Sequence, residues 1–366
     1  MSQTAPKYDC ILLTSFGGPE SQEEVVPFLE RVTAGRGIPA ERLLEVGQHY
    51  VRLGGVSPIN AQNRALLAAM REHFPSRGID LPIYWGNRNS APYFADVLNQ
   101  MHADGHKRVL AFVTSAYSSY SGCRQYRENL AAALAETGLA DQLQVDKIRQ
   151  YYDLPGFAAP VTQDLVDSIR NLAAARTDAV IMFTTHSIPT SMAETSGPES
   201  LRAETAEFGG TYTAQHLELA EEVMTNAGNA LAAAGTDATL PDWRLVYQSR
   251  SGSPHTPWLE PDINDAIAEE HAAGRKAVIV VPIGFISDHV EVIWDLDTQA
   301  AETAANLGLE YKRVRTAGIA PEFVDGIADL ILERLDGTLA STAPFCAANC
   351  CPNPRVQLPV VAESTP

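Results

Sequence analysis

Eight short apolar runs recur along the chain, and stretches with the 3.6-residue periodicity of helices separate them. Strand, helix and strand in alternation predict parallel sheets joined by right-handed crossovers. The division of the runs into two sets of four predicts an α/β fold of two similar doubly wound domains with a cleft between them. The runs cover 8–16, 81–85, 108–114, 143–151, 178–184, 243–248, 276–283 and 309–315.

The length of 366 residues is enough for about two domains. We expect an N-terminal α/β domain over 1–160, a C-terminal α/β domain over 161–337 and a cysteine-containing tail over 338–366. The composition of the tail, rich in Ala, Ser, Thr and Pro, buries little apolar area. We therefore expect the tail to be loose from about residue 338 unless a metal ties it down.

The charge balance excludes several classes of partner. The chain has 27 basic and 45 acidic residues, a formal net charge of −18, which argues against binding nucleic acid or an anionic membrane surface. No apolar signal segment begins the sequence. The longest apolar stretch, 277–286, contains Pro and Gly and is too short to span a bilayer. These features predict a cytoplasmic protein without a transmembrane segment.

Two polar segments follow apolar runs at positions where an open α/β sheet binds ligands. His186 comes after the run 178–184, and Glu291 and Asp295 come after the run 276–283. Ligands lie outside the carboxyl ends of parallel strands, so we expect the imidazole and the carboxylates to face one cleft. Both groups bind divalent cations, and histidine exchanges a proton near neutral pH. The pattern favours metal chemistry coupled to proton removal.

Simpler interpretations of the same residues stay open at this point. A lone histidine after a strand is more often a structural hydrogen-bonding residue than a ligand. Glu291 and Asp295 are four residues apart, which is also the pattern of a solvated acidic helix face.

Other segments suit a flat, apolar ligand that carries acidic groups. Glycines at 17 and 18 follow the first run and allow the backbone to approach a ligand closely. The segment 114–127 interleaves tyrosines, hydroxyl groups and arginines, which can cover an apolar ring and bind carboxylates at its rim. An ordinary strand-to-helix turn and a polar loop are the alternatives.

Taken together, these segments resemble the ferrochelatase family, whose members insert ferrous iron into a porphyrin. The matching stretches occur in family order and span most of residues 8–335. They are FGGP at 16–19, GGVSP at 54–58, YWGNRNSAPYF at 84–94, THSIP at 185–189, YQSRSGSPHTPWLEPDI at 247–263 and PIGFISDHVEVIWDLD at 282–297.

The resemblance implies roles for the residues at the strand ends. His186 corresponds to the histidine of the family that binds metal and accepts protons, and Glu291 corresponds to its acidic partner. Asp295 resembles the next member of an acidic row that conducts metal or protons. One turn further, where the family often has another acid, this chain has Gln299, so the row is shortened.

Substrate contacts are also implied by the resemblance. Ser57 and Tyr126 match positions that contact the porphyrin, and Arg36 and Tyr50 are further candidates for propionate contact. Phe16 stands where some bacterial relatives have a tyrosine that ligates iron. Because phenylalanine cannot coordinate, we expect an apolar surface on that side of the ring and metal ligation from the His186 side only.

The cysteines are too few for a disulfide framework. Cys346, Cys350 and Cys351 lie close together in the tail, a spacing that favours metal or cluster ligation in a reducing compartment. They resemble the C-terminal ligands of the two-iron, two-sulfur cluster of some ferrochelatases, which use one internal cysteine as well. We expect Cys123 in that position, because Cys10 is expected to be buried in the first strand.

The resemblance implies insertion of ferrous iron into coproporphyrin III, as in actinobacterial members, with the porphyrin, the iron and a downstream enzyme of haem synthesis as partners. The alternatives are a protoporphyrin IX ferrochelatase and a non-catalytic protein that binds haem or another tetrapyrrole. A two-domain small-molecule binding protein has a similar predicted fold, but it does not need the histidine and glutamate at the strand ends.

Overall fold

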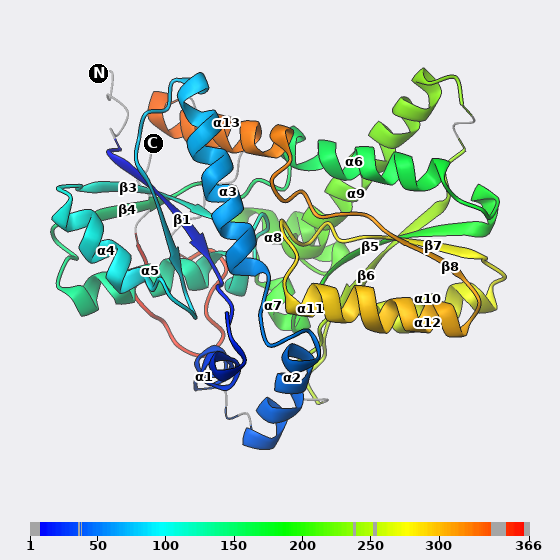
Figure 1. The fold of residues 1–366 in the computed structure, drawn as a ribbon, viewed down its shortest axis with the longest axis horizontal. Helices are drawn as coiled ribbons and strands as arrows, with labels where there is room; N and C mark the ends of the chain where they lie inside the picture. The colour runs from blue at the N-terminus through cyan, green and yellow to red at the C-terminus, as the bar shows by residue number, and fades with distance from the viewer. Residues whose placement is uncertain are drawn as a thin grey trace.

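The computed structural model describes residues 8–35, 37, 39–236, 239–251, 255–337 and 349–361. Within these ranges the strands form two four-stranded parallel sheets (Figure 1). The strands are β1 (Cys10–Ser15), β2 (Ile83–Asn87), β3 (Arg108–Val113), β4 (Gln144–Lys147), β5 (Ala179–His186), β6 (Asp242–Gln248), β7 (Ala277–Val281) and β8 (Glu310–Arg313). Each of the predicted runs overlaps one of these strands.

The two sheets have the same topology. Their orders are β2-β1-β3-β4 and β6-β5-β7-β8, so the second sheet repeats the first with the strand numbers raised by four. The predicted α/β fold of two similar doubly wound halves is therefore confirmed. Residues of β7 are completely buried, as expected for a parallel strand covered on both faces.

Helices cover both faces of the sheets. The first half contains α1 (Gln22–Val32), α2 (Ala40–Arg52), α3 (Ile59–His73), α4 (Phe94–Ala103) and α5 (Gln125–Thr137), and α6 (Pro155–Arg170), which follows them, packs on β7 of the second sheet. The second half contains α7 (Thr190–Glu194), α8 (Glu199–Thr205), α9 (Thr211–Ala233), α10 (Ile263–Ala272), α11 (Val290–Val292), α12 (Ala301–Asn306) and α13 (Pro321–Asp336). Short 3₁₀ and π turns are η1 (Phe74–Arg77), η2 (Tyr120–Arg124), η3 (Arg176–Asp178), η4 (Ala206–Phe208) and η5 (Ile293–Ala300).

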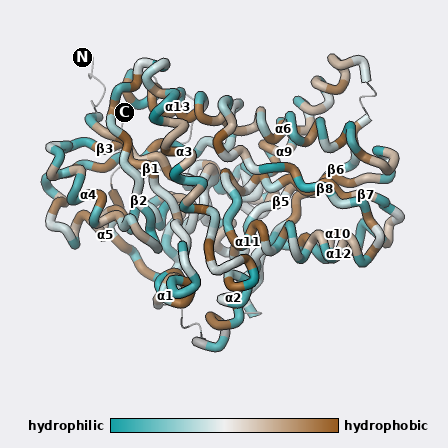
Figure 2. Tube along the Cα trace, viewed as in Figure 1, coloured by the Kyte–Doolittle hydropathy of each residue, from teal (hydrophilic) through white to brown (hydrophobic). Residues whose placement is uncertain are grey.

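One hydrophobic core joins the two halves. It includes Leu13 and Phe112 of the first sheet and Phe183 and Ile279 of the second. The last helix, α13, packs on α6 and on α3 of the N-terminal half, above the first sheet in the view of Figure 1. Figure 2 shows apolar segments in both halves and also in α1 and α2, which lie below and between them.

The tail is more ordered than its composition predicts. Residues 349–361, red in Figure 1, run past α5. Asn353 donates to the Tyr120 hydroxyl at 2.8 Å and to Glu128 at 3.1 Å, and the amide of Val361 donates to the carbonyl of Arg127 at 3.2 Å. The tail was expected to be loose unless a metal ties it down, and in this part hydrogen bonds to η2 and α5 hold the chain as well.

Among the helices of the described residues, none combines the length and the apolar character that a bilayer span requires.

Candidate functional site

His186 is the last residue of β5, at the carboxyl edge of the second sheet. Its Nδ1 lies 2.5 Å from the carbonyl oxygen of Ser187, and its own carbonyl accepts a hydrogen bond from Tyr212 at 2.9 Å. Because a carbonyl oxygen only accepts, Nδ1 carries the hydrogen of the ring. In its neutral form the imidazole therefore has its lone pair on Nε2.

Glu291 brings a carboxylate to that lone pair. It lies in α11, which follows β7, and β7 is the neighbour of β5 in the sheet. Its Oε2 is 3.7 Å from Nε2 of His186, and both side chains are partly exposed, at 44% and 32%. The structure thus brings together an imidazole acceptor and a carboxylate that sequence reasoning placed at the same edge.

Asp295 lies further along the same segment, in a π turn, although its spacing from Glu291 is also that of an ordinary helix face. The chain leaves the α conformation at Ile293 and forms η5. π turns are often found at functional sites. Asp295 accepts hydrogen bonds from the Ser249 hydroxyl and from Gln248 Nε2 at 3.3 Å. Burial, together with the charge of Glu291, raises the pKa of Asp295 to about 7.

Gln248 is itself held in one orientation. Its Oε1 accepts from the Thr184 hydroxyl at 3.0 Å, so its Nε2 is the group that faces Asp295. Ser249 has a φ of 61°, a conformation that costs energy for a residue other than glycine. Strained residues of this kind are concentrated at functional sites. Gln248 ends β6 and Ser249 follows it, within the stretch 247–263, so their position at the carboxyl end of a strand was the signal that could have found them.

An amide clamp from the other half of the molecule holds the segment before Glu291. Gln62 of α3 donates to the carbonyl of Asp288 and accepts from its amide, each at 2.9 Å. The Asp288 carboxylate accepts from Arg313 of β8 at 3.2 and 3.1 Å. The backbone of Asp288 is therefore held by Gln62 of the first half, and its side chain is held by Arg313 of the second half. Nothing in the sequence pattern of α3 indicates this role.

An apolar cluster from α1 and α2 lies against the same segment. Phe28, Tyr50 and Val290 are buried together, and Phe16 packs on them with its ring 6.0 Å from that of Phe28. Burial, and secondarily the charge of Glu291, raises the pKa of Tyr50. Tyr50 is thus an interior residue beside Glu291 and not part of an exposed polar rim.

The other predicted contact residues lie around the FGGP turn or outside the described structure. Ser57 is buried, and its amide donates to the carbonyl of Pro19 at 2.8 Å. Tyr126 is buried under the guanidinium of Arg88, which lies 4.7 Å from the ring centroid. Arg36 lies outside the described residues.

Three of the predicted cluster cysteines converge. Cys123, in η2, is buried together with Cys350 and Cys351 of the tail. The sulfurs of Cys350 and Cys351 are 3.5 Å apart, and the amide of Gly197 donates to Sγ of Cys351 at 3.1 Å. Cys346 lies outside the described residues.

The fold of two similar four-stranded parallel sheets is shared with the chelatase SirB. The structure of SirB from Bacillus subtilis with Fe³⁺ superposes with a TM-score of 0.50 over 92% of this chain and 99% of SirB. Its identity of 7% limits this likeness to the fold.

The chain belongs to the ferrochelatase family, whose sequence pattern matches residues 8–335. It is 52% identical to the coproporphyrin III ferrochelatase of Streptomyces coelicolor, over 95% of this chain and 94% of that protein. The coproporphyrin III ferrochelatase of Leifsonia xyli is 50% identical, over 98% and 95%. A ferrochelatase of Rhodopirellula baltica is 45% identical, over 94% of each chain.

The Gln62 clamp predicts an effect on turnover. Methionine at position 62 keeps the length of the side chain and removes both hydrogen bonds to Asp288. Because displacement of a catalytic group by about 1 Å costs up to ~100-fold in rate, we expect Gln62→Met to lower kcat roughly 10-fold and to leave the KM for porphyrin nearly unchanged. Steady-state kinetics well below the melting temperature measure this.

Gln142→Met is the matched control, because the Gln142 side chain is exposed and bonds only within its own turn. Its kcat is expected to equal that of the unmodified protein. Equal kcat values for the two glutamine variants would show that the clamp does not position Glu291.

Proposed function

We propose that this chain inserts ferrous iron into coproporphyrin III, and that His186 and Glu291 accept the inner pyrrole protons that the iron replaces. The observation that carries this proposal is the separation of 3.7 Å between His186 Nε2 and Glu291 Oε2, with Nδ1 of His186 already donating to Ser187. The nitrogen lone pair is available for a proton or for the incoming cation.

The geometry supports a path for the protons. A porphyrin nitrogen loses its proton to Nε2 of His186, and the adjacent carboxylate of Glu291 stabilises the imidazolium and takes the proton onward. Asp295 has a pKa of about 7, so it can accept and release a proton at neutral pH. The next position along the face, Gln299, is exposed and has no charge to continue the row. We therefore propose that protons leave to solvent from Asp295.

Few and weak ligands suit a cation that must be released. His186 and Glu291 offer one nitrogen and one carboxylate, which leaves most of the coordination sphere open. Phe16, in the apolar cluster with Phe28, supplies no ligand from the opposite side. The iron is thus held from the His186 side and passes to the stronger nitrogen ligands of the ring.

The choice of porphyrin is proposed from the names of the relatives in Streptomyces and Leifsonia. Coproporphyrin III carries more propionates than protoporphyrin IX. A site whose polar groups bind those carboxylates leaves some of these groups unpaired when protoporphyrin IX is bound. We therefore expect kcat/KM to favour coproporphyrin III by roughly 10-fold or more.

The test is anaerobic turnover of ferrous iron with each porphyrin in excess over protein, corrected for the rate without protein. Many turnovers with coproporphyrin III support the proposal. Faster turnover with protoporphyrin IX contradicts the choice of substrate. Formation of no more than one metalloporphyrin per chain would instead indicate a tetrapyrrole-binding protein.

The cysteine site suits an iron–sulfur cluster. Three buried cysteines from distant parts of the chain meet with an amide donor on one sulfur, and such donors are typical of cluster sites. We propose that Cys123, Cys346, Cys350 and Cys351 hold a two-iron, two-sulfur cluster. The bound cluster would supply a one-electron redox couple. Because Cys123 belongs to η2 and the other three cysteines to the tail, it would also link these two segments.

Substitution of Cys123 tests the cluster. We expect Cys123→Ser to lose the visible absorption and the paramagnetic resonance signal of the reduced cluster, together with its iron and acid-labile sulfide. Cys10→Ala is the control, because Cys10 is buried in β1 away from this group. Iron and sulfide contents equal to those of the control would exclude Cys123 as a ligand.

A further inference from the structure

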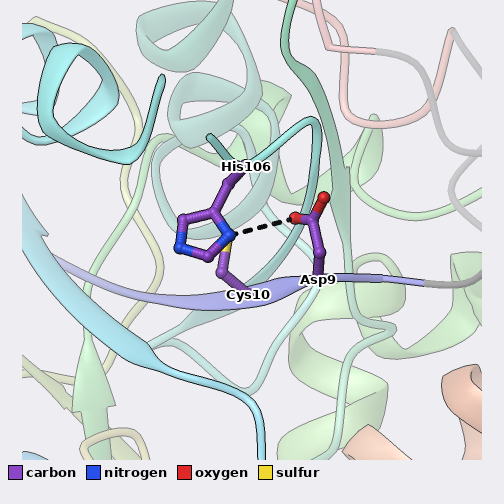
Figure 3. Close-up of side chains that lie close together, drawn as sticks. All are labelled: Asp9, Cys10 and His106. Atoms are coloured by element: carbon purple, nitrogen blue, oxygen red, sulfur yellow. Dashed lines mark ion pairs between the residues drawn. The ribbon is translucent and has the colours of Figure 1, made fainter. Parts of the chain in front are cut away.

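Three potential metal ligands converge at the edge of the first sheet where the amino ends of its strands lie. Cys10 is the first residue of β1, Asp9 directly precedes it, and His106 lies in the turn that precedes β3. One ligand atom from each residue lies within 4.8 Å of the others (Figure 3). These residues are at the amino ends of their strands, whereas the catalytic edge is at the carboxyl ends. The group is therefore separate from the site of iron insertion.

Hydrogen bonds behind the histidine ring define which nitrogen faces the group. The Tyr84 hydroxyl donates its only hydrogen to Oδ2 of Asp104 at 2.7 Å, and it lies 3.0 Å from Nε2 of His106. Nε2 must therefore be the donor in that contact. In the neutral ring the lone pair is on Nδ1, which faces Asp9 (Figure 3).

The distance between the two facing groups is too long for a hydrogen bond. Nδ1 of His106 is 3.7 Å from Oδ1 of Asp9. Ligand atoms around a tetrahedral zinc ion, with bonds of about 2.0 to 2.3 Å, are separated by about 3.3 to 3.8 Å. The nitrogen and the oxygen are therefore spaced as two ligands of one ion, and the Cys10 sulfur lies within reach of both.

The surroundings of the three residues resemble the support that metal ligands receive in proteins. A ligating histidine usually donates its other N–H to a polar partner, as His106 does to Tyr84. The Asp9 carboxylate is held by the amide of Lys107 at 2.8 Å and by that of Arg108 at 3.2 Å. A carboxylate and a thiolate would together balance the charge of a divalent ion.

Zinc binding at Cys10 requires the loss of the thiol proton. The Cys10 side chain is completely buried, and its sulfur lies within reach of the Asp9 carboxylate and the His106 ring. A zinc ion offsets the negative charge and releases the proton as it binds. Sulfur, imidazole nitrogen and carboxylate oxygen are all common zinc ligands, and such a site binds zinc more tightly than ferrous iron.

We propose that Asp9, Cys10 and His106 form a zinc site with water as the fourth ligand, and that the ion fixes the turn before β3 to the start of β1. The test uses the full-length chain stripped of metal with a chelator and titrated with Zn²⁺, with the bound metal measured by calorimetry and elemental analysis. His106→Gln is expected to bind one zinc ion fewer per chain than the unmodified protein. Because both proteins keep the catalytic residues and the other cysteines, the difference reports this group alone.

His102→Gln is the matched control, since His102 is exposed on the neighbouring helix α4. It is expected to bind as much zinc as the unmodified protein. Tyr84→Phe should keep the number of sites and weaken this one about 10-fold, because it removes the partner of Nε2. Iron insertion is expected to be unaffected in all three variants.

Cobalt identifies the sulfur ligand independently. In the cobalt-loaded protein, we expect the thiolate-to-metal charge-transfer absorption of this site to persist in Cys123→Ala and to disappear in Cys10→Ala. Equal zinc stoichiometry and affinity in His106→Gln and the unmodified protein would overturn the proposal and leave a hydrogen-bonded cluster. Binding of ferrous iron in preference to zinc would overturn the assignment of the metal.

Discussion

His186→Ala is expected to abolish iron insertion while the affinity for porphyrin stays within about threefold. The substitution removes the imidazole whose Nε2 faces Glu291 and leaves the apolar cluster of α1 and α2 intact. A positioned acid or base contributes roughly 10²- to 10⁴-fold to a rate, and the loss of a metal ligand adds to this. Single-turnover kinetics give the rate, and quenching of porphyrin fluorescence gives the affinity.

His271→Ala is the control for this substitution, because His271 is exposed near the end of α10. It is expected to insert iron at the normal rate. If His186→Ala did the same, the imidazole would have no role in proton removal and the proposed mechanism would fail. If it lost porphyrin binding instead, the residue would belong to the binding surface.

The strands could be predicted from the sequence because a parallel strand buried on both faces is a continuous apolar run. The residues of β7, Ala-Val-Ile-Val-Val, are an example, and all of them are completely buried. The meeting of His186 and Glu291 was predictable for a related reason. His186 ends β5 and Glu291 follows β7, and these two strands are neighbours in the sheet, so both residues lie at one edge.

The contacts that hold Glu291 could not be predicted. Gln62 binds Asp288 across 226 residues of sequence, and a glutamine on an amphipathic helix looks like any solvent-facing residue. The π turn η5 was missed as well, because its sequence has the apolar spacing of an ordinary helix. Hydrogen bonds between the halves of the molecule leave no periodic signal in the sequence of either half.

The tail shows where an argument from composition fails. Low apolar content predicts disorder when a segment must bury its own surface. Residues 349–361 are held by polar partners on another element, among them Glu128 and the backbone of Arg127. That same packing brings Cys350 and Cys351 to Cys123, which the spacing of the cysteines alone did not establish.

Glu291→Gln is expected to lower kcat by about 100-fold or more, because the amide keeps the shape of the side chain but neither accepts a proton nor stabilises the His186 imidazolium. Glu302→Gln, in α12 of the same domain, is the control and is expected to be fully active. A normal kcat for Glu291→Gln would show that the acidic segment is only a solvated surface.

The pH dependence of the same variant separates a chemical role from a structural one. The charge of Glu291 contributes, after burial, to the raised pKa of Asp295, which is about 7. Removing that charge favours ionisation of Asp295, so its pKa falls. If Asp295 passes protons to solvent, kcat of the unmodified protein rises with pH through an inflection near 7, and in Glu291→Gln the remaining activity rises through an inflection at lower pH. A variant that only loosened the fold would lose activity equally across the range. If the inflection lay at the same pH in Glu291→Gln as in the unmodified protein, Asp295 would not be part of the proton path.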